Sequence, residues 1–198
     1  MSASPKSDLF ADYALLPGVA DEVFDAEGQM RPVWRRFVER FARLTPDEVA
    51  ARFERGNQYL RDAGVFYRQY SGGASGDPLA EREWPLAHLP VILHEREWQG
   101  ICDGLGQRAD LLEQVVADLY GPGRLVAEGH LPASLIAASP QWLRPMVGVT
   151  PVGGKFLHQL AFEIGRSPDG SWLVLGDRVQ APSGAGFALE NRMATGRI

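Results

Sequence analysis

The sequence predicts an α+β fold, in which a helical N-terminal part precedes a mixed α/β portion with a central antiparallel β-hairpin. Two segments, about 32–63 and 95–119, carry apolar residues at the 3.6-residue spacing of amphipathic helices. Residues 156–178 instead alternate around a Ser167-Pro168-Asp169-Gly170 turn, which is typical of a hairpin. We therefore expect an N-terminal arm and helical hairpin over 1–63, and a second domain over 64–198.

The first two helices have clear starts. Pro32 suits the first position of a helix over about 32–43, because its missing N–H has no partner there. Thr45-Pro46-Asp47-Glu48 has the pattern of a capping box and predicts a second helix over about 46–63. Gly64 then suits the residue after that helix.

The middle of the chain alternates short strands with one long helix. Residues 65–70 are rich in strand-forming side chains, and 90–94 form a short apolar run, so both are predicted strands. The glycine-rich stretch 71–76 is not followed by Lys-Ser/Thr, which makes it a connection rather than a phosphate-binding loop. The helix predicted over 95–119 contains three glycines, which indicate close packing or a break: Gly100, Gly104 and Gly106.

The remaining segments are shorter. We expect a strand at 124–127, a short helix from Pro132 to about 138, and a helix carrying Glu190-Asn191-Arg192 after the hairpin. Gly153-Gly154-Lys155 could present N–H groups and an ammonium group to an anion, or could be a plain loop.

The hairpin has two faces of different character. Strict alternation places one apolar set on the core side: Leu160, Phe162, Ile164, Leu173 and Leu175. The other face carries Gln159, Glu163, Trp172, Val174, Gly176 and Arg178. A carboxylate and a guanidinium group beside a strand glycine form a candidate site, because such a glycine often marks close approach by a ligand. The alternative is an exposed face with one cross-strand charge pair.

Composition excludes several classes of function. A net charge of −5 argues against a nucleic-acid partner. The sequence contains no run of about 18 apolar residues, so no membrane span is predicted. The N-terminus lacks the apolar segment of a signal peptide. The sequence has one cysteine, Cys102, so an internal disulfide is excluded. The four histidines do not have the spacing of zinc ligands, so no zinc site is predicted. We expect a cytoplasmic protein.

The C-terminal segment shapes one further expectation. Residues 185–198 begin a helix, and the sequence stops at Gly196-Arg197-Ile198 without a closing element. We expect the chain to be the leading part of a longer protein.

A series of short motifs occurs in order along residues 64–192. They are Arg82-Glu83-Trp84-Pro85-Leu86, Leu89-Pro90, Glu97-Trp98, Gly104-Leu105, Gln107-Arg108, Tyr120-Gly121, His158 before the hairpin, Ala181-Pro182-Ser183-Gly184 and Leu189-Glu190-Asn191-Arg192. Together they resemble the circularly permuted ATP-grasp proteins of type 2, the bacterial proteins related to glutathionylspermidine synthetase. The resemblance implies that 64–198 is the leading part of a permuted ATP-grasp domain, cut at its C-terminal side.

The resemblance also implies a function. ATP-grasp enzymes use ATP and Mg²⁺ to convert a carboxylate to an acyl phosphate, which an amine then attacks to form an amide or peptide bond. A small-molecule or peptide substrate is implied, and the remainder of the longer chain is the expected partner of this segment, which alone should be inactive. The alternative is a non-catalytic ATP-grasp-like scaffold or binding protein with a degenerate metal site.

The resemblance assigns residues to roles. In the family, metal ligands come from an acidic residue on the first hairpin strand and a pattern resembling Glu-Asp-Asn on the second. Glu163 matches the first position and is the implied metal ligand, while the second reads Gly176-Asp177-Arg178. Glu163 and Asp177 are therefore the implied nucleotide- or metal-binding residues, and Mg²⁺ binding is weakened by Gly176 and Arg178. Arg178 is the implied catalytic residue, as a direct phosphate contact in place of a metal.

Four residues after the hairpin are implied to bind substrate. Ser183 and Gly184 stand at the start of the last predicted helix, and Asn191 and Arg192 stand within it. The alternatives are a helix cap for Ser183 and Gly184, and a structural bond to the hairpin for Asn191 and Arg192.

Overall fold

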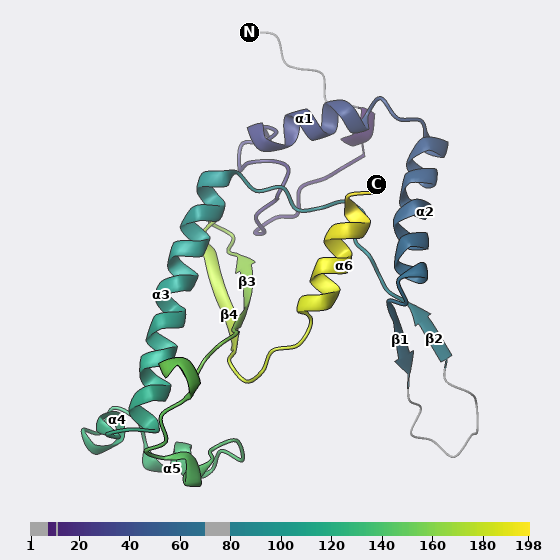
Figure 1. Ribbon diagram of the computed structural model, residues 1–198. Helices are drawn as coiled ribbons and strands as arrows, with labels where there is room; N and C mark the ends of the chain where they lie inside the picture. The colour runs from purple at the N-terminus through teal and green to yellow at the C-terminus, as the bar shows by residue number, and fades with distance from the viewer. Residues whose placement is uncertain (1–7, 11, 70–79) are drawn as a thin grey trace. The chain divides into compact units, whose positions relative to one another are not determined.

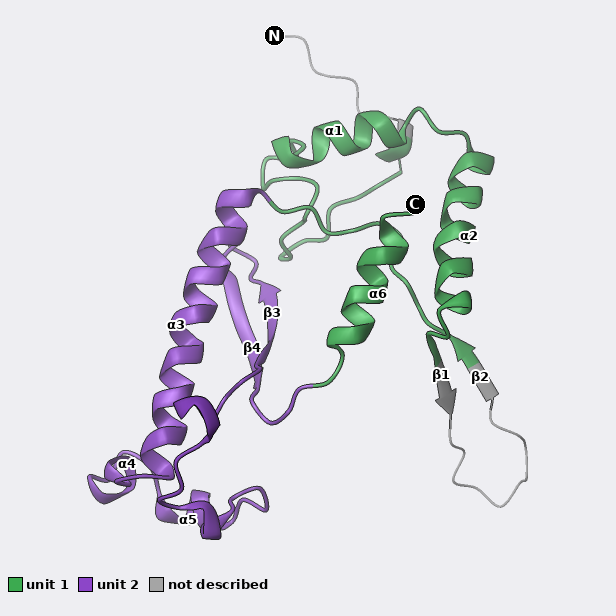
Figure 2. Cartoon of the chain, viewed as in Figure 1, with its two compact units in different colours: residues 1–93, 183–198 green, residues 94–182 purple. Residues whose placement is uncertain are grey.

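The computed structural model describes residues 8–10, 12–69 and 80–198, so the predicted connection 71–76 lies outside the described residues. The chain forms two compact units (Figure 2). Unit 1 comprises residues 1–93 and 183–198, and unit 2 comprises residues 94–182. The domain boundary predicted at 63/64 stays a prediction, because the division into these two compact units does not test it.

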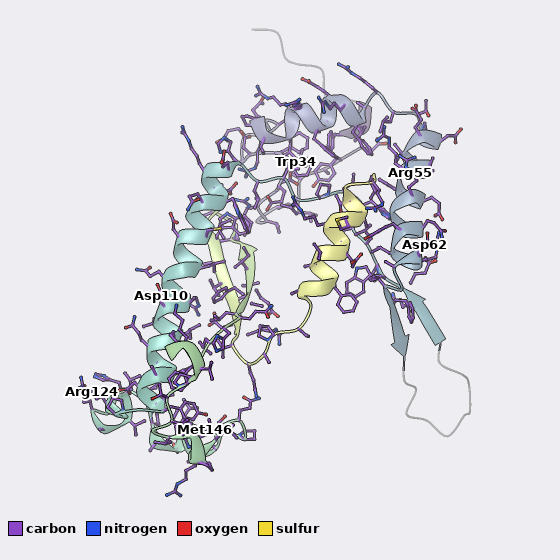
Figure 3. All side chains as sticks on the ribbon, in the orientation of Figure 1. Trp34, Arg55, Asp62, Asp110, Arg124 and Met146 are labelled. Atoms are coloured by element: carbon purple, nitrogen blue, oxygen red, sulfur yellow. The ribbon has the colours of Figure 1, made fainter. Side chains whose placement is uncertain are left out.

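Unit 1 begins with a short 3₁₀ helix, η1 (Asp8–Phe10), and an isolated bridge between Phe24 and Met30. Helix α1 (Pro32–Phe41) follows, with Pro32 in its first turn as predicted. Trp34, which lies on α1 (Figure 3), and Val38 are buried, so the apolar stripe of this helix is part of the core.

Helix α2 (Pro46–Asp62) has the predicted capping box. The Thr45 hydroxyl accepts a hydrogen bond from the Glu48 N–H, and the Glu48 carboxylate accepts one from the Thr45 N–H at 2.8 Å. Both bonds satisfy N–H groups that a helix start leaves without partners. Gly64 ends the helix region with φ of 72°.

The core of unit 1 lies beside α2. Strands β1 (Phe66–Gln69) and β2 (Ala80–Glu83) pair antiparallel, and helix α6 (Ala185–Thr195) runs alongside α2 (Figure 1). Leu60, Val65 and Ala194 are buried together. The Trp84 ring stacks on Phe187, with ring centroids 4.5 Å apart.

Unit 2 is organised along helix α3 (Glu95–Leu119), which is continuous through its three glycines. A Cβ at Gly100, Gly104 or Gly106 would meet nothing within 4 Å, so the predicted close packing and the predicted break are both wrong. The predicted strand at 90–94 is also wrong. That segment leads into the helix, where the His94 ring accepts a hydrogen bond from the Arg96 N–H.

Two short helices follow α3: α4 (Arg124–Ala127) and α5 (Ala133–Ala137). The strand predicted at 124–127 is therefore wrong. The Asp118 carboxylate accepts hydrogen bonds from the Arg124 and Leu125 N–H groups at 3.0 and 2.9 Å, which starts a helical turn there. The 3₁₀ turns η2 (Arg144–Met146) and η3 (Val152–Gly154) complete the connection to the hairpin.

The hairpin of β3 (Ala161–Arg166) and β4 (Trp172–Arg178) lies alongside α3 (Figure 1). Its register pairs Glu163 with Gly176 but Ile164 with Val174, so Leu175 is an extra residue in β4. Such a β-bulge breaks the alternation of side chains along the strand.

The bulge corrects the predicted faces. Trp172 pairs with Arg166, and Val174 pairs with Ile164. Both side chains therefore lie on the face of the hairpin that bonds to α3, and not beside Glu163. Leu173 and Leu175 are 49% and 69% exposed and are not core residues. The predicted grouping of Glu163, Gly176 and Arg178 is confirmed, as is the α+β fold class of the chain.

Candidate functional site

The turn of the hairpin forms as its sequence predicts. The Ser167 N–H donates to the Ser171 carbonyl at 2.8 Å, and Gly170 takes φ of 84°. The Asp169 carboxylate accepts from both the hydroxyl and the N–H of Ser171, and these bonds lower the pKa of Asp169. The turn therefore fixes the pairing of the two strands that carry the candidate site.

Glu163 and Arg178 form an ion pair on the hairpin face that does not bond to α3. Nε and Nη2 of Arg178 both donate to Oε1 of Glu163, with the Nε bond at 2.8 Å. The side chains are 53% and 66% exposed. Since this pair is open to solvent, it adds little stability, and its guanidinium group remains accessible to a ligand.

Because Gly176 has no side chain, the Glu163 carboxylate can occupy the space beside it. A Cβ at position 176 would lie 3.3 Å from Oε2 of Glu163, closer than ordinary contact. A larger side chain at this position would therefore displace the Glu163 carboxylate from its present place.

Asp177, by contrast, points to the other face of the hairpin. Its two oxygens each accept a hydrogen bond from Arg108 on α3, both at 2.7 Å, and the Asp177 side chain is 22% exposed. The bonds to Arg108 lower the pKa of Asp177 and raise the pKa of Arg108. Asp177 therefore ties β4 to α3 and does not share a site with Glu163.

A second link joins the other end of the hairpin to α3. Oε1 of Glu97 accepts a hydrogen bond from Trp172 Nε1 at 3.0 Å and lies 2.8 Å from Nη1 of Arg166. The Arg166 side chain is only 8% exposed, and its guanidinium carbon lies 4.3 Å from the centre of the Trp172 ring. Two anchors therefore hold the strands along α3.

An open groove of about 850 Å³ lies between α3 and the hairpin. Gly100 and Gly104 line it on the α3 side, where Asp110 also lies (Figure 3), and Ile164 and Val174 line it on the hairpin side. The glycines of α3 therefore widen the groove instead of letting the hairpin approach closely.

The described residues do not make a cation site on their own. Glu163 shares its oxygen with Arg178, and Asp177 is bound on both oxygens by Arg108. No three carboxylate, histidine or cysteine side chains of the described segments gather to hold a metal ion. A guanidinium group bonded to the single available carboxylate opposes the approach of Mg²⁺ by charge repulsion.

The loop before the hairpin binds an anion from within the chain. The N–H groups of Phe156 and Leu157 donate to the two oxygens of Glu113 on α3, at 2.9 and 2.8 Å. Gly153 and Gly154 both take φ of 73°, and the Gly154 N–H donates to Pro151. These two N–H groups lie just after the Gly153-Gly154-Lys155 segment, so anion binding by that segment itself stays a prediction.

The four predicted substrate residues lie in unit 1. Gly184, with φ of 107°, is the N-cap of α6 and accepts a hydrogen bond from the Ala188 N–H at 2.9 Å. Ser183 is exposed and does not cap the helix with its side chain. The first N–H groups of α6 thus lack a side-chain cap from the N-cap residue.

Further along α6, three neighbouring side chains differ in their environment. Glu190 accepts a hydrogen bond from the Tyr59 hydroxyl at 2.7 Å, and this bond raises the pKa of Tyr59. Oδ1 of Asn191 is buried without a hydrogen-bond partner among the described residues. Arg192 is exposed. A buried amide oxygen without a hydrogen bond is costly in a folded protein. Asn191 is therefore the residue of this group at which a ligand or a further segment of chain would supply a missing hydrogen bond.

Sequence reasoning missed the partners that hold the hairpin. Glu97 and Arg108 were among the motif residues but had no predicted role, and Glu113 and Arg166 were not singled out. The available signal was charge at positions 97 and 108 of a long predicted helix with an apolar stripe, because charged residues beside a core element generally have partners.

Residues 90–198 match the family model described as circularly permuted ATP-grasp type 2. This segment includes α3, the hairpin and α6, and it covers more than half of the chain. The chain therefore belongs to the circularly permuted ATP-grasp type 2 family.

Curated relatives extend this similarity to the residues before position 90. The uncharacterized protein sll0335 of Synechocystis is 33% identical over 172 residues, which cover 87% of this chain and 35% of the relative. The uncharacterized protein Rv2567 of Mycobacterium tuberculosis is 33% identical over 189 residues, covering 89% of this chain and 20% of the relative. The uncharacterized protein ML0605 of Mycobacterium leprae is 29% identical, with 90% and 30% covered. The chain thus spans about a third or less of these relatives.

In the described part of the chain, no helix has the length and apolar character needed to cross a membrane.

Proposed function

We propose that this chain is the leading part of a longer ATP-dependent carboxylate–amine ligase that forms an amide or peptide bond through an acyl phosphate. Family membership supports the use of ATP, and the segments that match this chain make up only 35% and 20% of two of the relatives. In this proposal residues 64–198 open the permuted ATP-grasp domain after the helical segment 1–63, and the remainder of the longer chain supplies the other parts of the nucleotide site.

The observation that carries the proposal is the Glu163–Arg178 pair. Arg178 bonds Glu163 through Nε and Nη2, and 66% of its side chain is exposed. A guanidinium group has five N–H donors in a planar fork that matches phosphate oxygens. We assign Arg178 the role of contacting the phosphate that is transferred, where it would offset negative charge.

The other residues have supporting roles in the proposal. Asp177 acts indirectly, because its bonds to Arg108 hold β4 in the register that turns Arg178 outward. Glu163 orients Arg178, and it would be a metal ligand only in a site completed by side chains outside this chain. Ser183, Gly184, Asn191 and Arg192 are proposed to face the substrate.

A second candidate function is a non-catalytic ATP-grasp-like protein that binds a partner or peptide. The observation that favours it is the absence of a metal-ligand cluster among the described residues. Gly176 and Arg178, which stand where the family pattern has metal ligands, are its sequence basis.

Calorimetric titration of the full-length protein with ATP, in EDTA and again with Mg²⁺, separates the two candidates. The ligase proposal predicts ATP binding that Mg²⁺ strengthens or leaves unchanged. Absence of ATP binding under both conditions would overturn it and favour the scaffold.

A further inference from the structure

A second pocket lies entirely within unit 1, apart from the hairpin. Its volume is about 360 Å³, within the range of small-molecule sites. Helices α1 and α2 and the segment at 88–89 supply most of its lining. The residues that the argument uses are Phe37, Phe41, Phe53, His88, Arg40 and Arg52.

Two parallel ring pairs contribute to the walls of this pocket. The rings of Phe37 and Phe41, one turn apart on α1, lie 5.6 Å apart with planes at 16°. The rings of Phe53 and His88 lie 4.4 Å apart with planes at 18°. The Nε2 atom of His88 is 2.8 Å from the Asn57 side-chain oxygen, which fixes the ring. Flat aromatic walls of this kind suit a ligand that contains a ring.

The polar groups that line the pocket are cationic or neutral. Arg40 and Arg52 line it, and no Asp or Glu side chain of the described residues does so. The Arg40 side chain makes no hydrogen bond or ion pair with any residue that the structure describes, and Arg52 uses Nη1 to bond the Ile198 carbonyl at 2.7 Å. Each guanidinium group therefore keeps N–H donors for another acceptor.

This arrangement differs from a solvated basic helix face. Arg35, Arg36 and Arg40 on α1 are all exposed, but Arg40 is the one of the three that lines the pocket, together with Arg52 on α2. An apolar recess edged by two arginines and no acid complements a molecule with an apolar body and a negative end.

We propose that this pocket binds a small organic carboxylate with an aromatic ring, seated between the ring pairs with its carboxylate on Arg40 and Arg52. The proposal rests on unit 1 alone and does not depend on the nucleotide site.

The test uses the full-length protein and three probes: 3-phenylpropionate, its neutral amide 3-phenylpropanamide, and propionate, which lacks the ring. We expect 3-phenylpropionate to bind at least about tenfold more tightly than either of the other two in a calorimetric or NMR titration, because each of them lacks one half of the recognition. Equal affinity for the amide, or no binding of 3-phenylpropionate at millimolar concentration, would overturn the proposal.

Variants locate the site. Arg40→Gln should weaken 3-phenylpropionate binding by about five- to tenfold, while the matched Arg35→Gln, on the same helix but outside the pocket, should leave it unchanged. Leu89→Asp places a negative charge at an exposed position of the lining and should abolish binding without disturbing the core. Equal losses for Arg40→Gln and Arg35→Gln, or displacement of the probe by equimolar inorganic phosphate, would contradict the proposed site. ATP affinity serves as an independent readout that these variants should not change.

Discussion

Arg108 on α3 and Asp177 on β4 form a two-point ion pair that joins positions 69 residues apart in the sequence. Each of the two hydrogen bonds measures 2.7 Å. Because neighbours along a strand point to opposite faces, this inward bond turns Gly176 and Arg178 to the opposite side of the hairpin. The pair therefore positions the candidate phosphate contact without touching it.

This pair predicts a dependence of stability on pH. The pKa of Asp177 is lowered in the folded protein by Arg108, so its contribution to stability is fully present above the unfolded value of about 3.9 and is lost as the pH falls through the lower folded value. Comparing urea midpoints of wild type and Asp177→Asn, we expect a constant deficit in the variant between pH 5 and 8. The deficit should shrink below about pH 4. A deficit that persists unchanged at pH 2.5 would contradict this account, and Asp110→Asn on α3 is the control.

The start of α6 predicts opposite effects for two glycines. Gly184 has φ of 107°, whereas Gly186 lies within the helix, and a Cβ at either position would meet nothing within 4 Å. Gly184→Ala should therefore lower the free energy of unfolding by about 1–2 kcal/mol through backbone strain alone. Gly186→Ala should raise it by about 0.5 kcal/mol. Chemical denaturation of both variants measures the difference, and a similar effect for the two would show that backbone conformation does not govern this site.

Glu113 predicts a local effect on the loop before the hairpin. Its two oxygens accept the N–H groups of Phe156 and Leu157. Glu113→Ala removes both acceptors and should reduce stability by about 2 kcal/mol, while Glu113→Gln retains one acceptor and should cost about half as much. Hydrogen exchange at these two amides should rise in the same order. Unchanged exchange in the alanine variant would mean that the loop is held by other contacts.

Sequence reasoning succeeded where local signals were strong. The capping box at Thr45, the turn at Asp169-Gly170 and the long helical period of 95–119 each set a local structure, and all three are present. It failed where a side-chain contact from outside the segment decided the outcome. Val126 favours a strand by propensity, but the Asp118 carboxylate accepts hydrogen bonds from the Arg124 and Leu125 N–H groups and starts a helical turn there.

The candidate site was only partly predictable for the same reason. The alternation rule correctly grouped Glu163 with Gly176 and Arg178. It misplaced Trp172 and Leu173 because the extra residue at Leu175 leaves no signal in a single sequence. The partner of Asp177, Arg108, lies on a helix far away in the sequence, so its role required the structure.

The hairpin also predicts how a metal site could be restored. Gly176→Glu combined with Arg178→Asn removes the guanidinium group from Glu163 and adds a second carboxylate on the same face. The double variant should bind Mg²⁺ more tightly than wild type in the presence of ATP, by about tenfold or more, because two carboxylates and an amide suit this ion. Calorimetric titration with Mg²⁺ measures the change. Arg178→Asn alone is the control, and an equal gain in both proteins would show that the new carboxylate is not a ligand.

The measurement that most directly tests the central claim is the affinity of the full-length protein for ATP in EDTA, compared between wild type, Arg178→Ala and Arg144→Ala. Arg144 is an exposed arginine of the same unit, away from the hairpin strands, so its variant controls for the loss of one positive charge. If Arg178 contacts phosphate, Arg178→Ala should weaken ATP binding by about tenfold or more, and Arg144→Ala should leave it unchanged. Equal ATP affinity in all three proteins would contradict the role of Arg178.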